Sequence, residues 1–138
     1  MEIVIIPVTP FAQNCSLIWD AGSKQGAFVD PGGDIQKLIG AASDNQVTIE
    51  KIILTHGHLD HVGGTVELAK HYDVPIIGPH LGDKFWLDAL MQQSQMFGFP
   101  PATPFVPNQW LNDKDTISVG ELTLEVLHCP GHTPGHVV

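Results

Sequence analysis

A dense group of metal-type side chains follows a continuously apolar segment in this chain. Residues 49–54 end in three consecutive aliphatic residues, as expected for a strand that is covered on both faces. The next residues, 55–64, predict a loop, and a loop at the end of a buried strand presents its side chains at the edge of the sheet. Three histidines and one aspartate lie within six residues of this loop: His56, His58, Asp60 and His61.

The spacing of these four residues predicts metal binding. Imidazole nitrogens suit zinc, iron and other borderline metals. His56 and His58 are two residues apart, so an extended backbone turns both side chains to the same side. Asp60 and His61 can then point to a second position nearby. A single histidine is usually an ordinary surface or core residue, but four such side chains at this spacing favour a metal centre.

A second histidine cluster lies near the end of the sequence, at residues 128–136. It also follows a predicted strand, and one of its histidines would complete a three-histidine set with His56 and His58. Zinc held by three protein ligands keeps a position open for water, which is typical of catalytic rather than structural sites. Zinc is therefore the expected metal, and iron and manganese accept the same ligands.

The remaining pattern predicts the fold class. A strand over residues 3–6, ended by Pro7, and strands over 15–19 and 27–29 would form an antiparallel meander. Asp34 is expected to cap a helix whose apolar face is Ile35, Leu38, Ile39 and Ala42. The other expected elements are a helix over 65–72, a strand over 74–77, a weak helix over 80–97 and a hairpin over 116–119 and 122–127. This order favours a layered α/β sandwich over a doubly wound parallel sheet.

Length and composition exclude several classes of protein. A chain of 138 residues is expected to form one domain. The net charge is −9, and all six basic residues are lysines, so nucleic acid is not an expected partner. No stretch approaches the roughly 18 apolar residues of a membrane span, and no signal peptide is recognisable. Cys15 and Cys129 predict two free thiols in a cytoplasmic protein, with Cys129 packed in the interior.

The motif from Thr55 to His61 resembles the metal-binding Thr-His-x-His-x-Asp-His motif of the metallo-β-lactamase superfamily. The later Gly-His-Thr-Pro-Gly-His stretch, residues 131–136, resembles that of glyoxalase II enzymes, and residues 6–32 resemble the opening meander of that branch. The resemblance implies a metallo-β-lactamase-type αββα sandwich. It implies that His56, His58 and His132 hold a first metal, and that Asp60 and His61 hold a second. His136 would have a packing role.

The activity implied by the resemblance is hydrolysis of a hydroxyacylglutathione-type thioester. A metal-activated hydroxide would attack the carbonyl carbon, and Asp60 would orient this nucleophile. A thiolate leaves readily, since thiol pKa values are about 8.5 by analogy with cysteine. The expected partner is thus a small thioester, with neither nucleic acid nor a membrane. The acyl group, the thiol carrier, the native metal and the oligomeric state stay open.

The chain departs from the family pattern at its end. The metal-bridging Asp and the last metal-ligand His of glyoxalase II enzymes lie beyond the Thr-Pro-Gly-His stretch, and the sequence stops at Val138. Residues 136–138 read as a strand cut short. The expectation is therefore a single metallo-β-lactamase-like domain over residues 1–138 that is incomplete at its C-terminal side. Residues that would grip glutathione would be missing too.

Two other functions remain open from the sequence. The same fold carries persulfide dioxygenases with one iron, for which three ligands suffice, as well as lactonases, β-lactamases and RNA-processing nucleases. A different class is a metal-binding or partner-binding module without catalysis, in which a closed four-ligand site is expected. The proline-rich segment 97–110 fits a partner surface, a wall of the substrate pocket or, more simply, a connecting loop.

Overall fold

The computed structural model describes residues 1–138, in which five strands form one sheet and two more form a separate hairpin. The strands are β1 (Glu2–Val8), β2 (Gln13–Trp19), β3 (Gln25–Val29), β4 (Thr48–Ile53), β5 (Ile76–Ile77), β6 (Thr116–Val119) and β7 (Leu122–Glu125). The helices are α1 (Ile35–Asp44), α2 (Leu59–Val62), α3 (Thr65–Tyr72), α4 (Lys84–Asp88) and α5 (Leu90–Phe97), with a 3₁₀ turn η1 (Leu81–Asp83).

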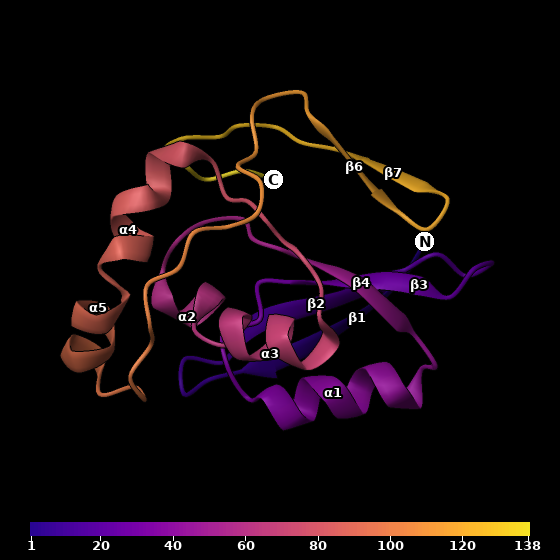
Figure 1. Cartoon of the computed structure of the whole chain (residues 1–138), viewed down its shortest axis with the longest axis horizontal. Helices are drawn as coiled ribbons and strands as arrows, with labels where there is room; N and C mark the ends of the chain where they lie inside the picture. Colours follow the sequence, from indigo (N-terminus) through magenta and orange to yellow (C-terminus); the bar gives the residue numbers. More distant parts are fainter.

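The large sheet is mixed and follows the chain in the order β1-β2-β3-β4-β5. Its first three strands form the expected antiparallel meander, and β3, β4 and β5 then run parallel. Parallel neighbours need a crossover, which α1 supplies between β3 and β4. Helices α1 and α3 lie on one face of the sheet, and the β6–β7 hairpin lies across the other (Figure 1). The prediction of a layered α/β fold with antiparallel pieces at both ends is confirmed.

Two hydrophobic cores hold these layers together. The larger one packs the sheet against the helices and includes the fully buried Phe28, Leu38 and Ile52. The smaller one packs the sheet against the hairpin and includes Ile53 and Val119. Neighbouring residues of β4 thus enter opposite cores, which explains why the end of this strand is apolar without alternation.

Pro7 does not end the first strand as expected, because β1 continues to Val8. A proline removes one backbone donor from a sheet, so it is tolerated mainly on edge strands. β1 pairs only with β2 and is such an edge. The prediction failed because the position of a strand within its sheet cannot be read from the local pattern.

Asp34 precedes α1, but its side chain does not cap the helix. The residue has a left-handed backbone (φ 53°), and its carboxylate instead accepts a hydrogen bond from the backbone N–H of Thr9 at 2.9 Å. The expected apolar face of α1 is confirmed, with Ile35, Leu38 and Ala42 buried. Asp34 therefore ties the β1–β2 turn to the start of α1.

Other boundaries also differ from expectation. Residues 55–64 are not all loop, because they include the single turn α2. The strand expected over 74–77 is reduced to the two residues of β5, and residues 80–97 divide into η1, α4 and α5. The second strand of the hairpin ends at Glu125. None of the helices combines the length and the apolar run that crossing a lipid bilayer requires.

Candidate metal centre

Three histidines from two distant parts of the chain meet at one edge of the structure. His56 and His58 follow β4, and His132 lies in the loop after β7. One ring nitrogen of each lies within 4.8 Å of the others. Each pair of rings meets nearly edge to face, with centroids 4.9 to 5.0 Å apart. The fold therefore gathers the three residues expected to share a first metal ion.

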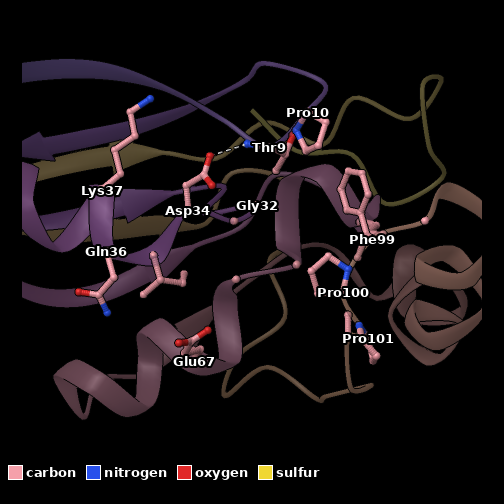
Figure 2. A pocket seen from close by; sticks show the side chains of 17 residues that line it. Thr9, Pro10, Gly32, Asp34, Gln36, Lys37, Glu67, Phe99, Pro100 and Pro101 are labelled. Carbon is pink, nitrogen blue, oxygen red and sulfur yellow. Dashed lines mark hydrogen bonds between the residues drawn. The ribbon is translucent and has the colours of Figure 1, made fainter.

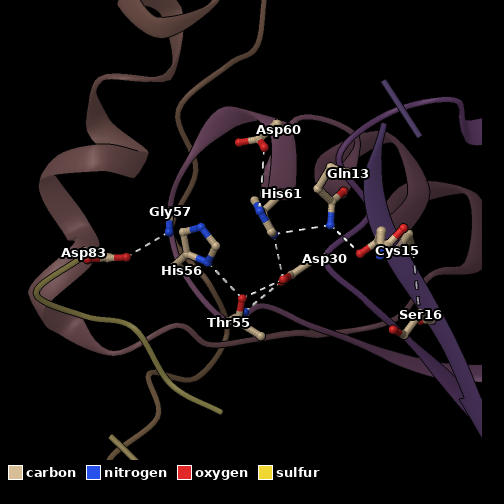
Figure 3. A network of polar contacts seen from close by, with 11 residues as sticks. Gln13, Cys15, Ser16, Asp30, Thr55, His56, Gly57, Asp60, His61 and Asp83 are labelled. Atoms are coloured by element: carbon tan, nitrogen blue, oxygen red, sulfur yellow. Dashed lines mark hydrogen bonds and ion pairs between the residues drawn. The ribbon is translucent and has the colours of Figure 1, made fainter. Parts of the chain in front are cut away.

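A hydrogen-bond chain fixes the ring of His56 (Figure 3). The hydroxyl of Thr55 donates to Oδ2 of Asp30 at 2.5 Å, so its oxygen must accept from Nδ1 of His56, 2.9 Å away. The proton of His56 is thereby assigned to Nδ1, and Nε2 carries the free lone pair. Nε2 is buried and has no hydrogen-bond partner. A buried polar atom without a partner is costly, and a metal ion is the partner that this lone pair fits.

The electrostatics of the cluster favour the neutral forms of His56 and His58. Burial, followed by the charges of the neighbouring imidazoles of His61, His58, His136 and His132, lowers the pKa of His56 to about 3. Burial is also the main cause that lowers the pKa of His58, against the opposite effect of the carboxylates of Asp60 and Asp83. Only a neutral imidazole offers a lone pair to a metal, so these shifts favour ligation.

Asp60 and His61 lie in α2, next to the three-histidine group. Nδ1 of His61 is 2.9 Å from Oδ2 of Asp30, and its Nε2 is 3.6 Å from Oδ2 of Asp60. The free nitrogen of His61 therefore lies beside the carboxylate that was expected to share its metal. Ligand atoms of Asp30, His56 and His61 also lie within 4.8 Å of one another. Asp60 is in neither three-residue group.

Asp30 was not expected at the site, yet it accepts three hydrogen bonds there. Its donors are the backbone N–H and the hydroxyl of Thr55, and the ring of His61. These bonds favour an orienting role over direct ligation, because they occupy both carboxylate oxygens. Asp30 follows β3 with a left-handed backbone (φ 57°), which Asp tolerates better than most residues.

Two more polar residues near the ligands were missed from the sequence. The buried side chain of Asp83 contacts both histidine segments, and the buried amide of Gln93 accepts from the N–H of Leu59 at 3.0 Å and donates to the carbonyl of Trp86 at 2.9 Å. Both lie in residues 80–97, where the weak helical pattern gave no functional signal. The Trp86 ring stands edge to face against His58, with centroids 4.8 Å apart.

The other histidines and the cysteines lie outside the ligand groups. His136 is half-buried, with its ring centroid 5.0 Å from that of His56. The rings of His80 and His128 stack on each other at 4.0 Å, whereas His71 lies on the exposed surface of α3. Both cysteines are free, as expected, but Cys129 is exposed, so its predicted interior position is wrong. Its backbone N–H donates to the carbonyl oxygen of His136 at 2.8 Å, and its side chain remains at the surface.

The structure has a surface cavity of about 890 Å³ (Figure 2). It is lined by the β1–β2 turn, the start of α1, the residues at either end of α2 and the segment 98–102. Phe99, Pro100 and Pro101 form one wall, so part of the proline-rich segment lines a surface cavity. None of the histidines of the metal centre lines this cavity.

Comparison with known proteins agrees with this fold and site. A family model described as the Metallo-beta-lactamase superfamily matches residues 8–138. The chain therefore belongs to the metallo-β-lactamase superfamily, and its His-rich site is typical of that fold.

The chain is similar to particular members of this superfamily in both sequence and structure. The hydroxyacylglutathione hydrolase GloC of Haemophilus influenzae is 45% identical over 138 residues, which cover 99% of this chain and 65% of that protein. The crystal structure of the B3 metallo-beta-lactamase BLEG-1 superposes with a TM-score of 0.86 at 31% identity, over 99% of this chain and 65% of that one. The di-iron-bound form of TTHA1623 superposes with a TM-score of 0.84 at 28% identity, over 97% and 64%. The chain thus spans slightly less than two thirds of the length of these relatives.

Proposed function

We propose that this chain belongs to a metal-dependent hydrolase that cleaves a hydroxyacylglutathione-type thioester. The observation that carries the proposal is the buried Nε2 of His56, which has no hydrogen-bond partner, in a residue that forms a possible ligand group with His58 and His132. The 45% identity to a protein named hydroxyacylglutathione hydrolase supports the choice of substrate class.

In this proposal His56, His58 and His132 hold the first metal ion, and Asp60 and His61 contribute to a second. Zinc is the proposed metal, with iron or manganese as alternatives. When bound by such ligands, a metal ion polarises a carbonyl and lowers the pKa of a water to about 7. Three imidazole ligands leave a coordination position open, as an enzyme requires. Asp60, on the first turn of α2, would orient the nucleophile, with its carboxylate held beside His61.

The residues behind the ligands have a defined part in this scheme. Asp30 and Thr55 hold protons on the Nδ1 atoms of His61 and His56, so both rings present Nε2 to the metal centre. Such outer partners fix the tautomer and orientation of a ligand histidine. Hydrolysis of a thioester requires no strong general acid from the protein, because a thiolate is a good leaving group.

The test is hydrolysis of lactoylglutathione by the zinc-loaded and iron-loaded chain, with and without chelator. His58→Ala should lose metal and reduce turnover by at least about 100-fold, since metal activation supplies several kcal/mol. His71→Ala is the matched control, because His71 is exposed on α3 and away from the cluster. It should keep both metal content and turnover.

Full turnover in His58→Ala, or turnover that resists the chelator, would contradict the proposal. Dioxygen uptake with a persulfide by the iron-loaded chain, without thioester hydrolysis, would move the function to the dioxygenase alternative. Stoichiometric metal binding with no exchangeable ligand would instead support a non-catalytic module.

A further inference from the structure

Asp83 is a buried carboxylate that connects the two histidine segments. Its Oδ2 accepts from the N–H of Gly57 at 2.8 Å and from the hydroxyl of Thr133 at 2.7 Å. Its Oδ1 accepts from the N–H of Gly135 at 2.7 Å. Gly57 lies between His56 and His58, and Thr133 directly follows His132. One side chain therefore holds both segments that supply the three-histidine group (Figure 3 shows its bond to Gly57).

The carboxylate of Asp83 does not serve its own helix. The residue stands at the N-cap of α4, where an aspartate ordinarily accepts a hydrogen bond from the helix, but no such bond is present. The side chain is fully buried and points away from the helix toward the two histidine segments. Burying a carboxylate is costly unless donors surround it, and here three donors from those two segments do so.

The glycines of the two segments allow this close approach. A Cβ on Gly135 would lie 2.5 Å from the backbone nitrogen of Asp83 and 2.8 Å from its Cβ. A Cβ on Gly57 would lie 2.8 Å from the Cβ of Trp86 and 3.3 Å from the carbonyl oxygen of Asp83. Both positions therefore favour glycine, because the segments pack closely against η1 and the start of α4.

We propose that Asp83 is the positioning residue that sets the spacing between the His56–His58 pair and His132. This inference rests on the proposed metal centre and deepens it. Two of its bonds reach the backbone and one reaches a hydroxyl, so Asp83 acts through the segments that carry the ligands and touches neither metal nor substrate.

The test uses cobalt affinity, measured on the full chain by competition with a chromophoric chelator, and the visible spectrum of the bound cobalt. Loss of an outer partner of a metal ligand typically weakens metal binding about 10- to 100-fold. Asp83→Ala should fall in this range. Asp83→Asn should lose about 10-fold, because its amide can replace only one of the two accepting oxygens.

Thr133 supplies a subtler pair of variants that keeps the test valid if Asp83→Ala does not fold. Thr133→Val removes only the hydroxyl that donates to Asp83, and should weaken cobalt binding about 10-fold and change the cobalt spectrum. Thr133→Ser keeps the hydroxyl and should restore the affinity and the spectrum. Asp88→Asn is the matched control, because it removes an exposed carboxylate of α4 whose ion pair is with Lys84.

The melting temperature of each metal-free variant separates positioning from folding. Wild-type cobalt affinity and spectrum in both Asp83→Asn and Thr133→Val would overturn the inference, even if the metal-free proteins were less stable. Absence of cobalt binding by the unaltered chain would also overturn it. Cobalt binding that depends on Asp83, without thioester hydrolysis, would support the inference while contradicting the proposed function.

Discussion

Nδ1 of His61 lies 2.9 Å from Oδ2 of Asp30, a residue 31 positions earlier in the chain. The same oxygen accepts the hydroxyl of Thr55, which in turn accepts from His56. Through one carboxylate, the end of β3 thus fixes the rings of two histidines. Hydrogen bonds within the protein therefore orient these two rings without a metal ion.

Replacing Asp30 with Asn should therefore disturb both histidines. Asn keeps the size and the tolerance for a left-handed backbone but offers one accepting oxygen in place of two. We expect a loss of about 2 kcal/mol in the free energy of unfolding, because a buried donor loses its acceptor, and weaker metal binding. Urea unfolding checks this, with Asp44→Asn at the exposed end of α1 as the control. Equal stability of the two variants would show that the Asp30 network is dispensable.

Replacement of glycine by alanine should have opposite effects on stability at Gly32 and at Gly40. A Cβ on Gly32 would lie 1.7 Å from the backbone oxygen of Asp60, so Gly32→Ala must displace α2 and should cost at least about 3 kcal/mol. Gly40, in the middle of α1, has nothing within 4 Å of such a Cβ. Gly40→Ala should stabilise the protein by about 0.5 to 1 kcal/mol. Thermal unfolding of the two variants gives the comparison, and a neutral Gly32→Ala would refute the contact.

The two thiols should differ sharply in reactivity. Cys15 is fully buried in β2, and burial, with a further effect of the Asp30 charge, raises the pKa of its thiol. Cys129 is exposed. Because the thiolate is the reactive form, a thiol-specific reagent should modify one cysteine in the native protein and two in denaturant. Mass spectrometry of the labelled peptide should place the native label on Cys129, and rapid native labelling of Cys15 would be inconsistent with the core.

The metal-free protein should lose stability in mild acid. An unfolded histidine takes up a proton below its ordinary pKa of 6.5, whereas burial and the neighbouring imidazoles lower the pKa of folded His56 to about 3. Between these values the unfolded state binds more protons, so stability falls as the pH drops below about 6.5. Urea unfolding at pH 7.5, 6.5 and 5.5 measures this slope, and His56→Gln should flatten it. A pH-independent free energy of unfolding would contradict the burial of a neutral His56.

The strongly patterned parts of the fold could be predicted from the sequence. The meander, the apolar face of α1 and the helix over 65–72 follow from local periodicity. Errors arose where tertiary context decides. Pro7 fits inside β1 because that strand is at an edge, and Asp34 gives up its capping role for a bond to Thr9.

The residues of the candidate site also divide into those that the sequence predicts and those that it does not. The histidines that meet at the centre could be predicted from their residue type and spacing. Asp30 and Asp83 do not, because their importance lies in partners that are far away in sequence. A lone aspartate after a strand, or before a weak helical segment, has the same local pattern whether it faces solvent or receives three donors. Only the folded chain separates these cases.

The bonds from Asp83 to both histidine segments also bear on the order of assembly. Asp83 links the segment of His56 and His58 to the segment of His132. The chain between these two segments, which includes the β6–β7 hairpin, forms a long loop. Contacts that close such a long loop form late, because the chain loses conformational entropy before these contacts can stabilise it. During synthesis, the early histidines must wait for the late one to leave the ribosome. Metal uptake by the three-histidine group would therefore follow the synthesis and folding of the residues up to 132.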